Sequence, residues 1–157
     1  MSNHLRSLCV FCGSSPGARP EYVQAAEALD ALLAQRGIEL VFGGGSIGMM
    51  GAVARATIAA GGTATGVIPR ALLRREIAQS GLTRMHVVES MHERKALMAE
   101  LSEGFVALPG GFGTLEEFFE VLTWAQLGFH RKPVALLDVA GFFAPMINLL
   151  DHMAMQG

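Results

Sequence analysis

The chain has 157 residues, of which 51% are hydrophobic and 17% are charged, and its formal net charge is −2. The apolar content excludes a disordered chain. The charge balance gives no electrostatic reason to expect binding to nucleic acid or to an anionic membrane, because both need a surplus of basic side chains. A length near the usual size of about 100–150 residues predicts a single domain over residues 1–157.

Apolar runs of strand length alternate with longer segments of helical period along the whole chain. We expect strands at residues 8–12, 38–42, 63–68, 85–88, 105–108 and 134–137. We expect helices at residues 21–35, from a glycine cluster to residue 60, at 91–101, at 115–127 and from residue 142, while residues 69–80 are basic and irregular. Continuous apolar strands separated by helices are typical of a parallel sheet covered on both faces. The sequence therefore predicts an α/β fold with a doubly wound parallel sheet of the Rossmann-like class.

The two cysteines, Cys9 and Cys12, lie on the first expected strand. Residues three apart on a strand point to opposite faces, and no second pair is present to complete a tetrahedral zinc site. We interpret both as core residues and expect no metal site. Two cysteines cannot staple a chain of this size, which indicates a reducing compartment. With no recognisable signal peptide or membrane span, the expected location is the cytoplasm.

Glycine is the unusual residue in this composition, with 19 copies in the chain. Eight of them fall in two short clusters, residues 43–51 and 110–113. Each cluster follows an expected strand and precedes an expected helix. Because ligands of such sheets bind beyond the carboxyl ends of the strands, both clusters are expected at the ligand-binding edge.

The first cluster contains Gly43-x-Gly45-x-x-Gly48, with Ser46 inside it. In this context glycines let the backbone approach a phosphate, and they point free amides and a helix N-terminus at it. Full NAD binding is not favoured, because the next strand ends at residues 68–70 without the carboxylate that would hold a ribose. A phosphate-loop NTPase is excluded, since no Gly-Lys-[Ser/Thr] occurs. The alternative is that these glycines serve only a tight turn and close helix–strand packing.

Residues 91–95, Met-His-Glu-Arg-Lys, open a helix directly after a strand. The basic pair Arg94 and Lys95 is expected near the ligand-binding edge. The guanidinium of Arg94 is suited to forming a fork onto a phosphate or a sugar hydroxyl. The alternative is an ordinary solvated helix start.

The second cluster lies within Pro-Gly-Gly-Phe-Gly-Thr-Leu-Glu-Glu, residues 109–117, and gives the sharpest signal. A strand ends, glycines expose their amides, and a helix begins with two adjacent carboxylates, Glu116 and Glu117. A structural alternative is a capping box, in which Thr114 caps the helix and Glu117 bonds back to the cap amide. That alternative does not explain the three glycines and the proline that come before Thr114.

Residues 43–51, 91–95 and 109–117 resemble the Lonely Guy (LOG) family, and the similarity runs from about residue 8 to the end of the chain. The resemblance implies a phosphoribohydrolase that cuts cytokinin riboside 5′-monophosphates, or AMP, into the free base and ribose 5-phosphate. It implies no metal and no redox cofactor, and it implies a homodimer. Members of the family usually continue past the position at which this sequence stops.

The same resemblance implies catalytic roles for Arg94 and Glu117. It matches Glu76 to the glutamate on the base side of the family's site. The candidate phosphate-binding residues of the first cluster are added to those that the resemblance implies. The expected substrate-binding residues are then Gly45, Ser46, Gly48, Glu76, Lys95, Gly111, Phe112, Gly113, Thr114, Leu115, Glu116 and Thr123.

Related sequences have been labelled lysine decarboxylases, and the residues of this chain argue against that activity. A pyridoxal enzyme needs a Schiff-base lysine, and the chain contains only Lys95 and Lys132. The main alternative is a non-catalytic carrier of a nucleotide or of the molybdenum cofactor on the same scaffold, which keeps the glycine clusters but leaves Glu117 without chemistry. A purely structural dimer module would bind no nucleotide.

The helix after the second cluster supports the expectation of a homodimer. Its apolar side chains are not confined to one narrow stripe along the helix. The apolar surface is therefore wider than packing against the sheet alone requires. We therefore expect this helix to contact a partner subunit as well as the sheet through part of the set Leu115, Phe118, Phe119, Leu122 and Trp124.

Overall fold

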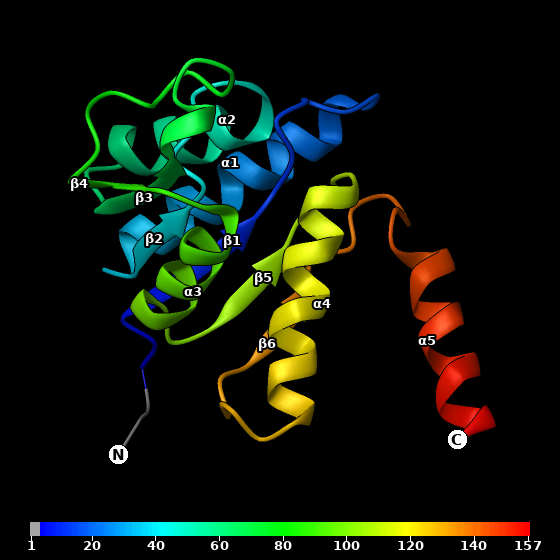
Figure 1. Ribbon diagram of the computed structural model, residues 1–157. Coiled ribbons are helices and arrows are strands. Elements are labelled where there is room, and N and C mark those ends of the chain that lie inside the picture. Colours follow the sequence, from blue (N-terminus) through cyan, green and yellow to red (C-terminus); the bar gives the residue numbers. More distant parts are fainter. Residues whose placement is uncertain (1–3) are drawn as a thin grey trace.

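Six parallel strands form the central sheet of the computed structural model, which describes residues 4–157 (Figure 1). The strands are β1 (Ser7–Phe11), β2 (Glu39–Phe42), β3 (Ala64–Pro69), β4 (Arg84–Val88), β5 (Phe105–Ala107) and β6 (Val134–Leu136). The helices are α1 (Pro20–Gln35), α2 (Gly48–Ala59), α3 (Met91–Leu101), α4 (Phe112–Gln126) and α5 (Ala144–Gln156), with a short 3-10 helix η1 (Arg70–Leu72). The predicted α/β architecture is confirmed.

The strand order β4-β3-β2-β1-β5-β6 makes β1 the point at which the chain changes direction across the sheet. From β1 the chain proceeds outward through β2, β3 and β4, and it then crosses back to pair β5 with the other side of β1. The loops after β1 and β5 therefore diverge to opposite faces of the sheet. In doubly wound proteins the ligand crevice lies at this switch point, beyond the carboxyl ends of the strands.

Two apolar clusters, one on each face of the sheet, form the core. Leu40 and Phe42 of β2 pack with buried residues of α1 and α2, whereas Val41 packs with residues of α3 and α4. Cys9 belongs to the cluster of α3 and α4 and Cys12 to the cluster of α1 and α2. The prediction that the two cysteines are core residues on opposite faces is confirmed.

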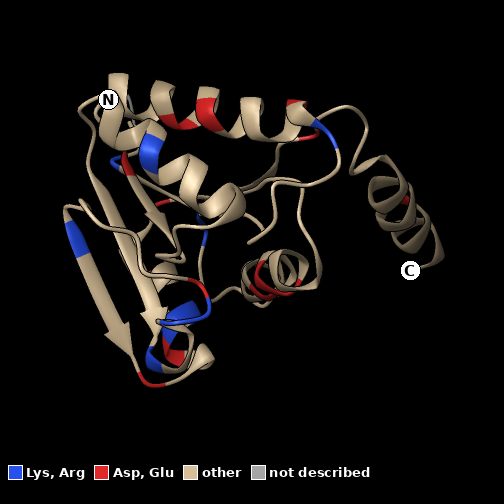
Figure 2. Cartoon of the chain, turned by 90° about the horizontal axis from the view of Figure 1, so that it is seen from above, with Lys and Arg blue, Asp and Glu red and all other residues tan. Residues whose placement is uncertain are grey.

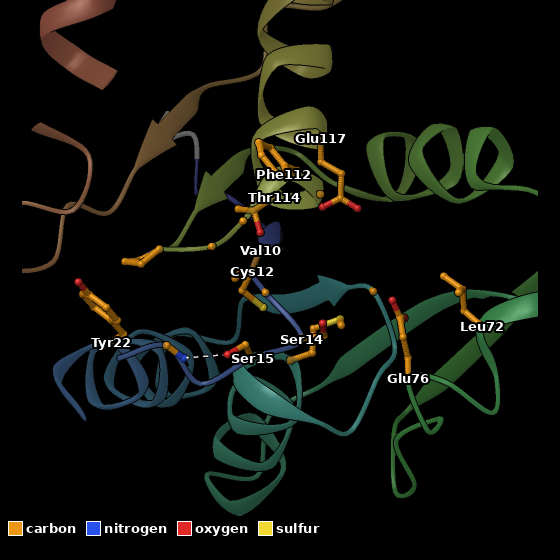
Figure 3. Close-up of a pocket in the computed structure, with 18 of the residues that line it drawn as sticks. Val10, Cys12, Ser14, Ser15, Tyr22, Leu72, Glu76, Phe112, Thr114 and Glu117 are labelled. Atoms are coloured by element: carbon orange, nitrogen blue, oxygen red, sulfur yellow. Dashed lines mark hydrogen bonds between the residues drawn. The ribbon is translucent and has the colours of Figure 1, made fainter. Parts of the chain in front are cut away.

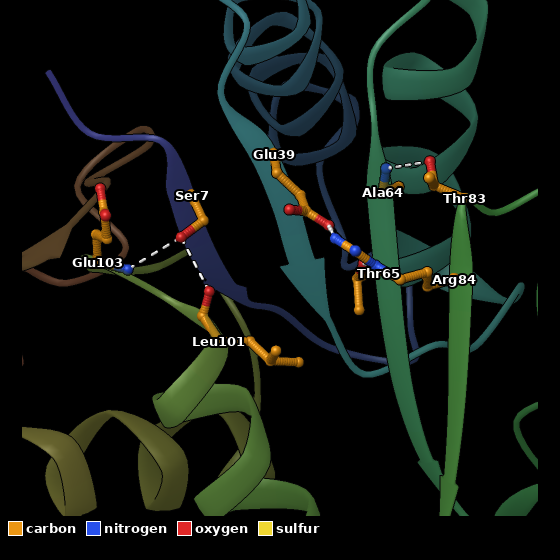
Figure 4. A network of polar contacts seen from close by, with 8 residues as sticks. All are labelled: Ser7, Glu39, Ala64, Thr65, Thr83, Arg84, Leu101 and Glu103. Atoms are coloured by element: carbon orange, nitrogen blue, oxygen red, sulfur yellow. Dashed lines mark hydrogen bonds and ion pairs between the residues drawn. The ribbon is translucent and has the colours of Figure 1, made fainter.

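Polar contacts close the amino edge of the sheet (Figure 4). The Glu39 carboxylate accepts hydrogen bonds from Thr65 Oγ1 and from Arg84 Nη2, at 2.5 and 2.6 Å. Ser7 Oγ donates to the carbonyl oxygen of Leu101 at 2.9 Å. These side chains satisfy one another, so the amino edge carries structural contacts and the opposite edge is left for a ligand.

α4 begins at Phe112, three residues earlier than the sequence predicts, and its N-cap residue is Gly111. Thr114 therefore lies inside the first turn, and no side chain caps the helix. The capping-box interpretation of Thr114 and Glu117 is wrong. The difference arises because Gly113 lies inside the first turn of the helix, where its low helix propensity favours a loop from the sequence alone.

α5 stands apart from the rest of the chain and contributes no buried residue (Figures 1 and 2). Asp151 is its single residue among Asp, Glu, Lys and Arg, so its ribbon is almost entirely tan in Figure 2. Within residues 4–157, no helix has the length and apolar character that crossing a membrane requires. The same residues contain no cluster of three or more His, Cys, Asp or Glu side chains placed to hold a metal ion.

Asp30 is a buried acidic residue on α1. It is 0% exposed, and neither carboxyl oxygen has a hydrogen-bond partner among the described residues. Burial raises its pKa to about 8, because an ionised carboxylate would lose its hydration there.

Asp30→Asn should flatten the dependence of stability on pH. Between about pH 4 and pH 8 the folded protein keeps the Asp30 proton and the unfolded chain releases it, so rising pH favours unfolding. The free energy of unfolding should fall for the wild type, relative to the variant, by up to about 1.4 kcal/mol per pH unit in this window. Urea unfolding at both ends of the window measures the difference. Parallel pH profiles for the two proteins would show that Asp30 is ionised in the fold.

Candidate active site

A cavity of about 570 Å³ lies at the switch point, beyond the carboxyl ends of the strands (Figure 3). Its size is within the usual range of roughly 300–1,000 Å³ for small-molecule sites. The loops after β1 and β5, the first turns of α3 and α4 and the segment after η1 contribute to its wall. The cavity therefore occupies the place at which the topology predicts a ligand.

Glu117 reaches the cavity from the second turn of α4. Its pKa is raised to about 7, chiefly because burial removes water from the carboxylate, while the nearby Arg94 acts in the opposite direction. A carboxyl group with a pKa near neutrality can exchange a proton at physiological pH. In Figure 3 the carboxyl groups of Glu117 and Glu76 extend into the cavity from opposite sides.

Arg94 lies at the floor of the cavity and is 4% exposed. Its Nε donates to the carbonyl oxygen of Val67 at 3.0 Å, and its Nη2 donates to that of Gly43 at 2.5 Å. Nη2 also pairs with Glu76 Oε2 at 3.0 Å. The guanidinium thus ties together the ends of β2 and β3 and one carboxylate of the site.

Hydrogen bonds at the start of α3 fix the position of Arg94. Ser90 is the N-cap residue, and its Oγ accepts a hydrogen bond from Glu93 N at 3.1 Å. Glu93 Oε2 accepts one in return from Glu89 N at 2.7 Å, which holds the chain just before the helix. These reciprocal bonds resemble a capping box, and they fix the first turn of the helix that carries Arg94.

Glu76 lies on the irregular segment between η1 and β4. Backbone hydrogen bonds join this segment to the first glycine cluster. Ser46 N donates to the carbonyl oxygens of Glu76 and Ile77, at 3.1 and 2.8 Å, and Gln79 N donates to Gly44 O at 2.8 Å. Ile77 has a φ of 49°, in the left-handed region that a β-branched residue rarely adopts. This strained turn directs the Glu76 carboxylate toward Arg94.

The N-terminal turn of α4 presents polar groups to the cavity. Gly111, Phe112, Gly113 and Thr114 line it, and their amides belong to a helix N-terminus, which favours anions. Thr114 is buried, and its Oγ1 has no hydrogen-bond partner among residues 4–157. Gly110 is required beside it, because a Cβ at that position would collide with Thr114 Oγ1.

The first glycine cluster contributes less to the cavity than the sequence predicts. Gly45, Ser46 and Gly48 do not line it, and a Cβ at Gly48 would collide with the backbone of the loop after β1. The Ser46 amide already bonds to the segment that carries Glu76. These contacts fit the packing alternative, and phosphate binding by the three residues stays a prediction. Gly43 does line the cavity, and a Cβ at this position would collide with Arg94 Nη2.

Lys95, Glu116 and Thr123 lie on a different surface from the cavity. They line a shallow depression between α3 and α4, with Trp124 among their neighbours. Lys95 Nζ pairs with Glu116 Oε1 and with Glu120 Oε2, each at 2.6 Å. Helix geometry explains the separation, because Glu116 and Glu117 project about 100° apart around α4. Leu115, the remaining predicted residue, packs against the core.

Several residues of the cavity wall were not predicted from the sequence. They are Cys12, Ser14 and Ser15 just after β1, Tyr22 in the first turn of α1, and Phe142 before α5. The signal for the first group was the turn at residues 13–17 after a buried strand. Phe142 had no such signal, because only the fold brings the segment after β6 to this edge.

The arrangement defines a class of protein: a doubly wound α/β protein whose switch-point cavity combines two carboxylates, one buried arginine and a glycine-rich helix start. A family model described as "Possible lysine decarboxylase" matches residues 50–157. The cytokinin riboside 5′-monophosphate phosphoribohydrolase of Rhodococcoides fascians is 48% identical over 153 residues, which cover 97% of this chain and 77% of that relative. The chain belongs to this family, the family of the LOG phosphoribohydrolases.

Other similarities agree with this assignment. The probable cytokinin riboside 5′-monophosphate phosphoribohydrolase LOGL5 of Oryza sativa subsp. japonica is 49% identical over 156 residues, and the chain spans 63% of its length. The molybdenum cofactor binding protein from Rippkaea orientalis superposes with a TM-score of 0.71 at 25% identity, covering 94% of this chain and 86% of that one. The molybdenum cofactor carrier protein of Chlamydomonas reinhardtii, with a TM-score of 0.67 at 23% identity over 94% of this chain and 99% of that one, shares the fold.

The residues present do not fit the pyridoxal cofactor that a lysine decarboxylase would use. Such an enzyme holds its cofactor through a Schiff-base lysine in the active site. Lys95 pairs with two glutamates outside the cavity, and Lys132 Nζ donates to the carbonyl oxygen of Ala99 at 2.7 Å. Neither lysine lines the cavity, so the family description does not extend to decarboxylation by this chain.

Proposed function

We propose that this protein hydrolyses the N-glycosidic bond of nucleoside 5′-monophosphates, releasing the free base and ribose 5-phosphate. The substrates are AMP, a cytokinin riboside 5′-monophosphate, or both. The observation that carries the proposal is Glu117, a carboxyl group with a pKa raised to about 7 that faces Glu76 across a cavity of about 570 Å³. Two relatives with 48% and 49% sequence identity are named cytokinin riboside 5′-monophosphate phosphoribohydrolases, and these names support the same reaction.

The 5′-phosphate binds at the N-terminal turn of α4 in this proposal. Helix N-termini attract anions, and the Thr114 hydroxyl next to them lacks a partner within the described chain. The two carboxylates of Glu76 and Glu117 would repel a phosphate, which places it away from them. The sugar then lies between the phosphate and the carboxylates, with its anomeric carbon close to Glu117.

Bond cleavage proceeds through a sugar with oxocarbenium character, as in other glycoside hydrolyses. The bond between the anomeric carbon and the base nitrogen breaks, and the base takes the electron pair together with one proton, which balances the proton that the attacking water loses. Water supplies the oxygen that bonds to the anomeric carbon. Glu117 either stabilises the cationic sugar or accepts the proton of that water. Arg94 holds Glu76 on the base side of the site.

AMP should release adenine without added metal, and adenosine should be a poor substrate. Adenosine lacks the phosphate that the α4 terminus would bind, so its kcat/KM should be lower by roughly 10- to 150-fold, which corresponds to the loss of about 1.5–3 kcal/mol from hydrogen bonds to a charged group. Chromatography of the two reactions measures the ratio. Equal turnover of AMP and adenosine would show that the N-terminal turn of α4 does not bind the phosphate during the reaction.

The alternative is a carrier that binds a nucleotide or the molybdenum cofactor without cleaving it. The similarity to the Rippkaea protein is the observation that favours it. A carrier would bind AMP and return it unchanged, so the same chromatogram separates the two functions. We propose a cytoplasmic location for either function, because the two cysteines are free thiols in the core.

We also propose that the protein is a homodimer through the exposed surface of α3 and α4. The depression there is lined by Phe119 and Trp124 around the Lys95 ion pairs. Next to it, Leu127 and Phe129 at the end of α4 are 62% and 75% exposed. Apolar side chains gathered on an exposed surface in this way are typical of a protein interface.

Light scattering should therefore give about twice the chain mass of 16.7 kDa at micromolar concentration. Trp124→Glu should shift the mass toward one chain, because it would bury an unpaired charge at the interface. Glu27→Gln, on α1, serves as the matched surface control. A wild-type mass of one chain would contradict the proposal.

A further inference from the structure

The cavity extends past the residues that the proposed reaction uses, and its far end is aromatic. We propose that Tyr22 and Phe142 form a second subsite, which binds a planar ring attached to the 5′-phosphate of a nucleotide. The ligand class is a nucleotide phosphodiester or a dinucleotide-like molecule. This inference rests on the proposed function for the placement of the sugar and the phosphate.

The order of the strands gives the length of the cavity. Its wall runs along the carboxyl edge from Glu76, after β3, past Gly43, Ser14 and Gly110, after β2, β1 and β5, to Phe142, after β6. Neighbouring strands lie about 4.8 Å apart, so these four steps span roughly 19 Å. Figure 3 shows Tyr22 and Glu76 at opposite ends of the cavity.

A nucleoside monophosphate occupies only part of this length. With the anomeric carbon at Glu117, the phosphate is one furanose ring and one methylene group away, about one strand spacing along the edge. That position is the α4 terminus beside Thr114 and Gly110. Tyr22 and Phe142 lie on the far side of it, where a monophosphate has no atoms to place.

At the end of the cavity opposite Glu76, two aromatic side chains offer a surface on which a planar ring can pack. The rings of Tyr22 and Phe142 meet edge to face, with centroids 5.6 Å apart and an interplanar angle of 78°. Gly17, with a φ of 79°, makes room for this pair, because a Cβ there would lie 2.7 Å from Tyr22 Cδ2. The two acidic residues of the cavity wall, Glu76 and Glu117, lie at the opposite end. Because no charged residue of the cavity wall lies at this end, the aromatic pair fits an uncharged planar group.

Two esters of AMP test the subsite directly, because they differ only in the group on the phosphate. The phenyl ester carries a ring and the methyl ester does not, while both have the same charge. Isothermal titration calorimetry with the wild-type protein should show the phenyl ester binding roughly 3- to 10-fold more tightly, the range that one aromatic pair supplies. Equal dissociation constants for the two esters would overturn the proposal.

Variants locate the effect at the aromatic end. Tyr22→Leu and Phe142→Leu keep apolar volume but remove the rings, so each should reduce the phenyl preference to less than about twofold and leave methyl ester binding unchanged. Ile58→Leu, at an exposed apolar residue outside the cavity, should keep the full preference. A preference that survives in both ring variants would contradict the assignment. Hydrolysis of AMP, measured on the same samples, reports separately on the proposed function.

Discussion

Glu117→Gln should lower the rate of AMP hydrolysis by at least about 100-fold and leave the fold intact. Glutamine has the same shape but cannot accept a proton or carry the charge that an oxocarbenium-like sugar needs. The fold should tolerate the change, since α4 is capped by the backbone at Gly111 and Glu117 takes no part in a capping box. Adenine release and a melting curve for each protein are the measurements.

Glu116→Gln is the matched control for this prediction. Glu116 is the adjacent carboxylate, yet it is 57% exposed and pairs with Lys95 outside the cavity, so the variant should retain most of the activity. The wild-type kcat/KM should also rise with pH through about 7 and then level off, because Glu117 must lose its proton. A Glu117→Gln protein with a rate near that of the wild type would mean that this carboxylate has no catalytic role.

Arg94→Ala should remove both activity and a large part of the stability. The substitution leaves two buried carbonyl oxygens, of Gly43 and Val67, without their donor, and it leaves the Glu76 carboxylate without its cation. Breaking a buried pair and orphaning such groups costs about 3–5 kcal/mol of the free energy of unfolding. Urea unfolding followed by the fluorescence of Trp124, the single tryptophan, measures this loss.

Arg94→Lys separates the effect of the positive charge from the effect of the planar guanidinium geometry. Lysine restores a cation, but its single ammonium cannot reproduce the planar fork that reaches both carbonyl oxygens and Glu76. We expect a stability between those of the wild type and Arg94→Ala, with activity still low. If Arg94→Ala unfolded at the same urea concentration as the wild type, the contacts of Arg94 would not stabilise the ends of the strands.

Local patterns predicted most of the fold, because strands and helices of a doubly wound protein differ in period and in apolar content. The same patterns predicted that both glycine clusters lie at the carboxyl edge, and the structure places them there. The start of α4 was predicted too late, since glycines at residues 111 and 113 lower helix propensity while tertiary contacts still allow the helix.

The partners of each site residue were less predictable. From the sequence, Arg94 was expected to contact a phosphate or a sugar hydroxyl. In the structure its ion pair is with Glu76, which a strained turn at Ile77 brings across the cavity. Glu116 and Glu117 are adjacent in sequence and still face different surfaces, as the helix geometry requires. Tyr22 and Phe142 come together only because β6 lies next to β5, and that order is a property of the sheet and not of either segment.

The measurement that tests the central claim most directly is the product analysis of AMP after incubation with the wild-type protein. Adenine and ribose 5-phosphate should appear in equal amounts, with turnover well beyond one AMP per chain and no added metal. Glu117→Gln, run in parallel, should leave AMP unchanged while melting at a similar temperature. Binding of AMP without release of adenine by the wild-type protein would contradict the hydrolase account and identify a carrier.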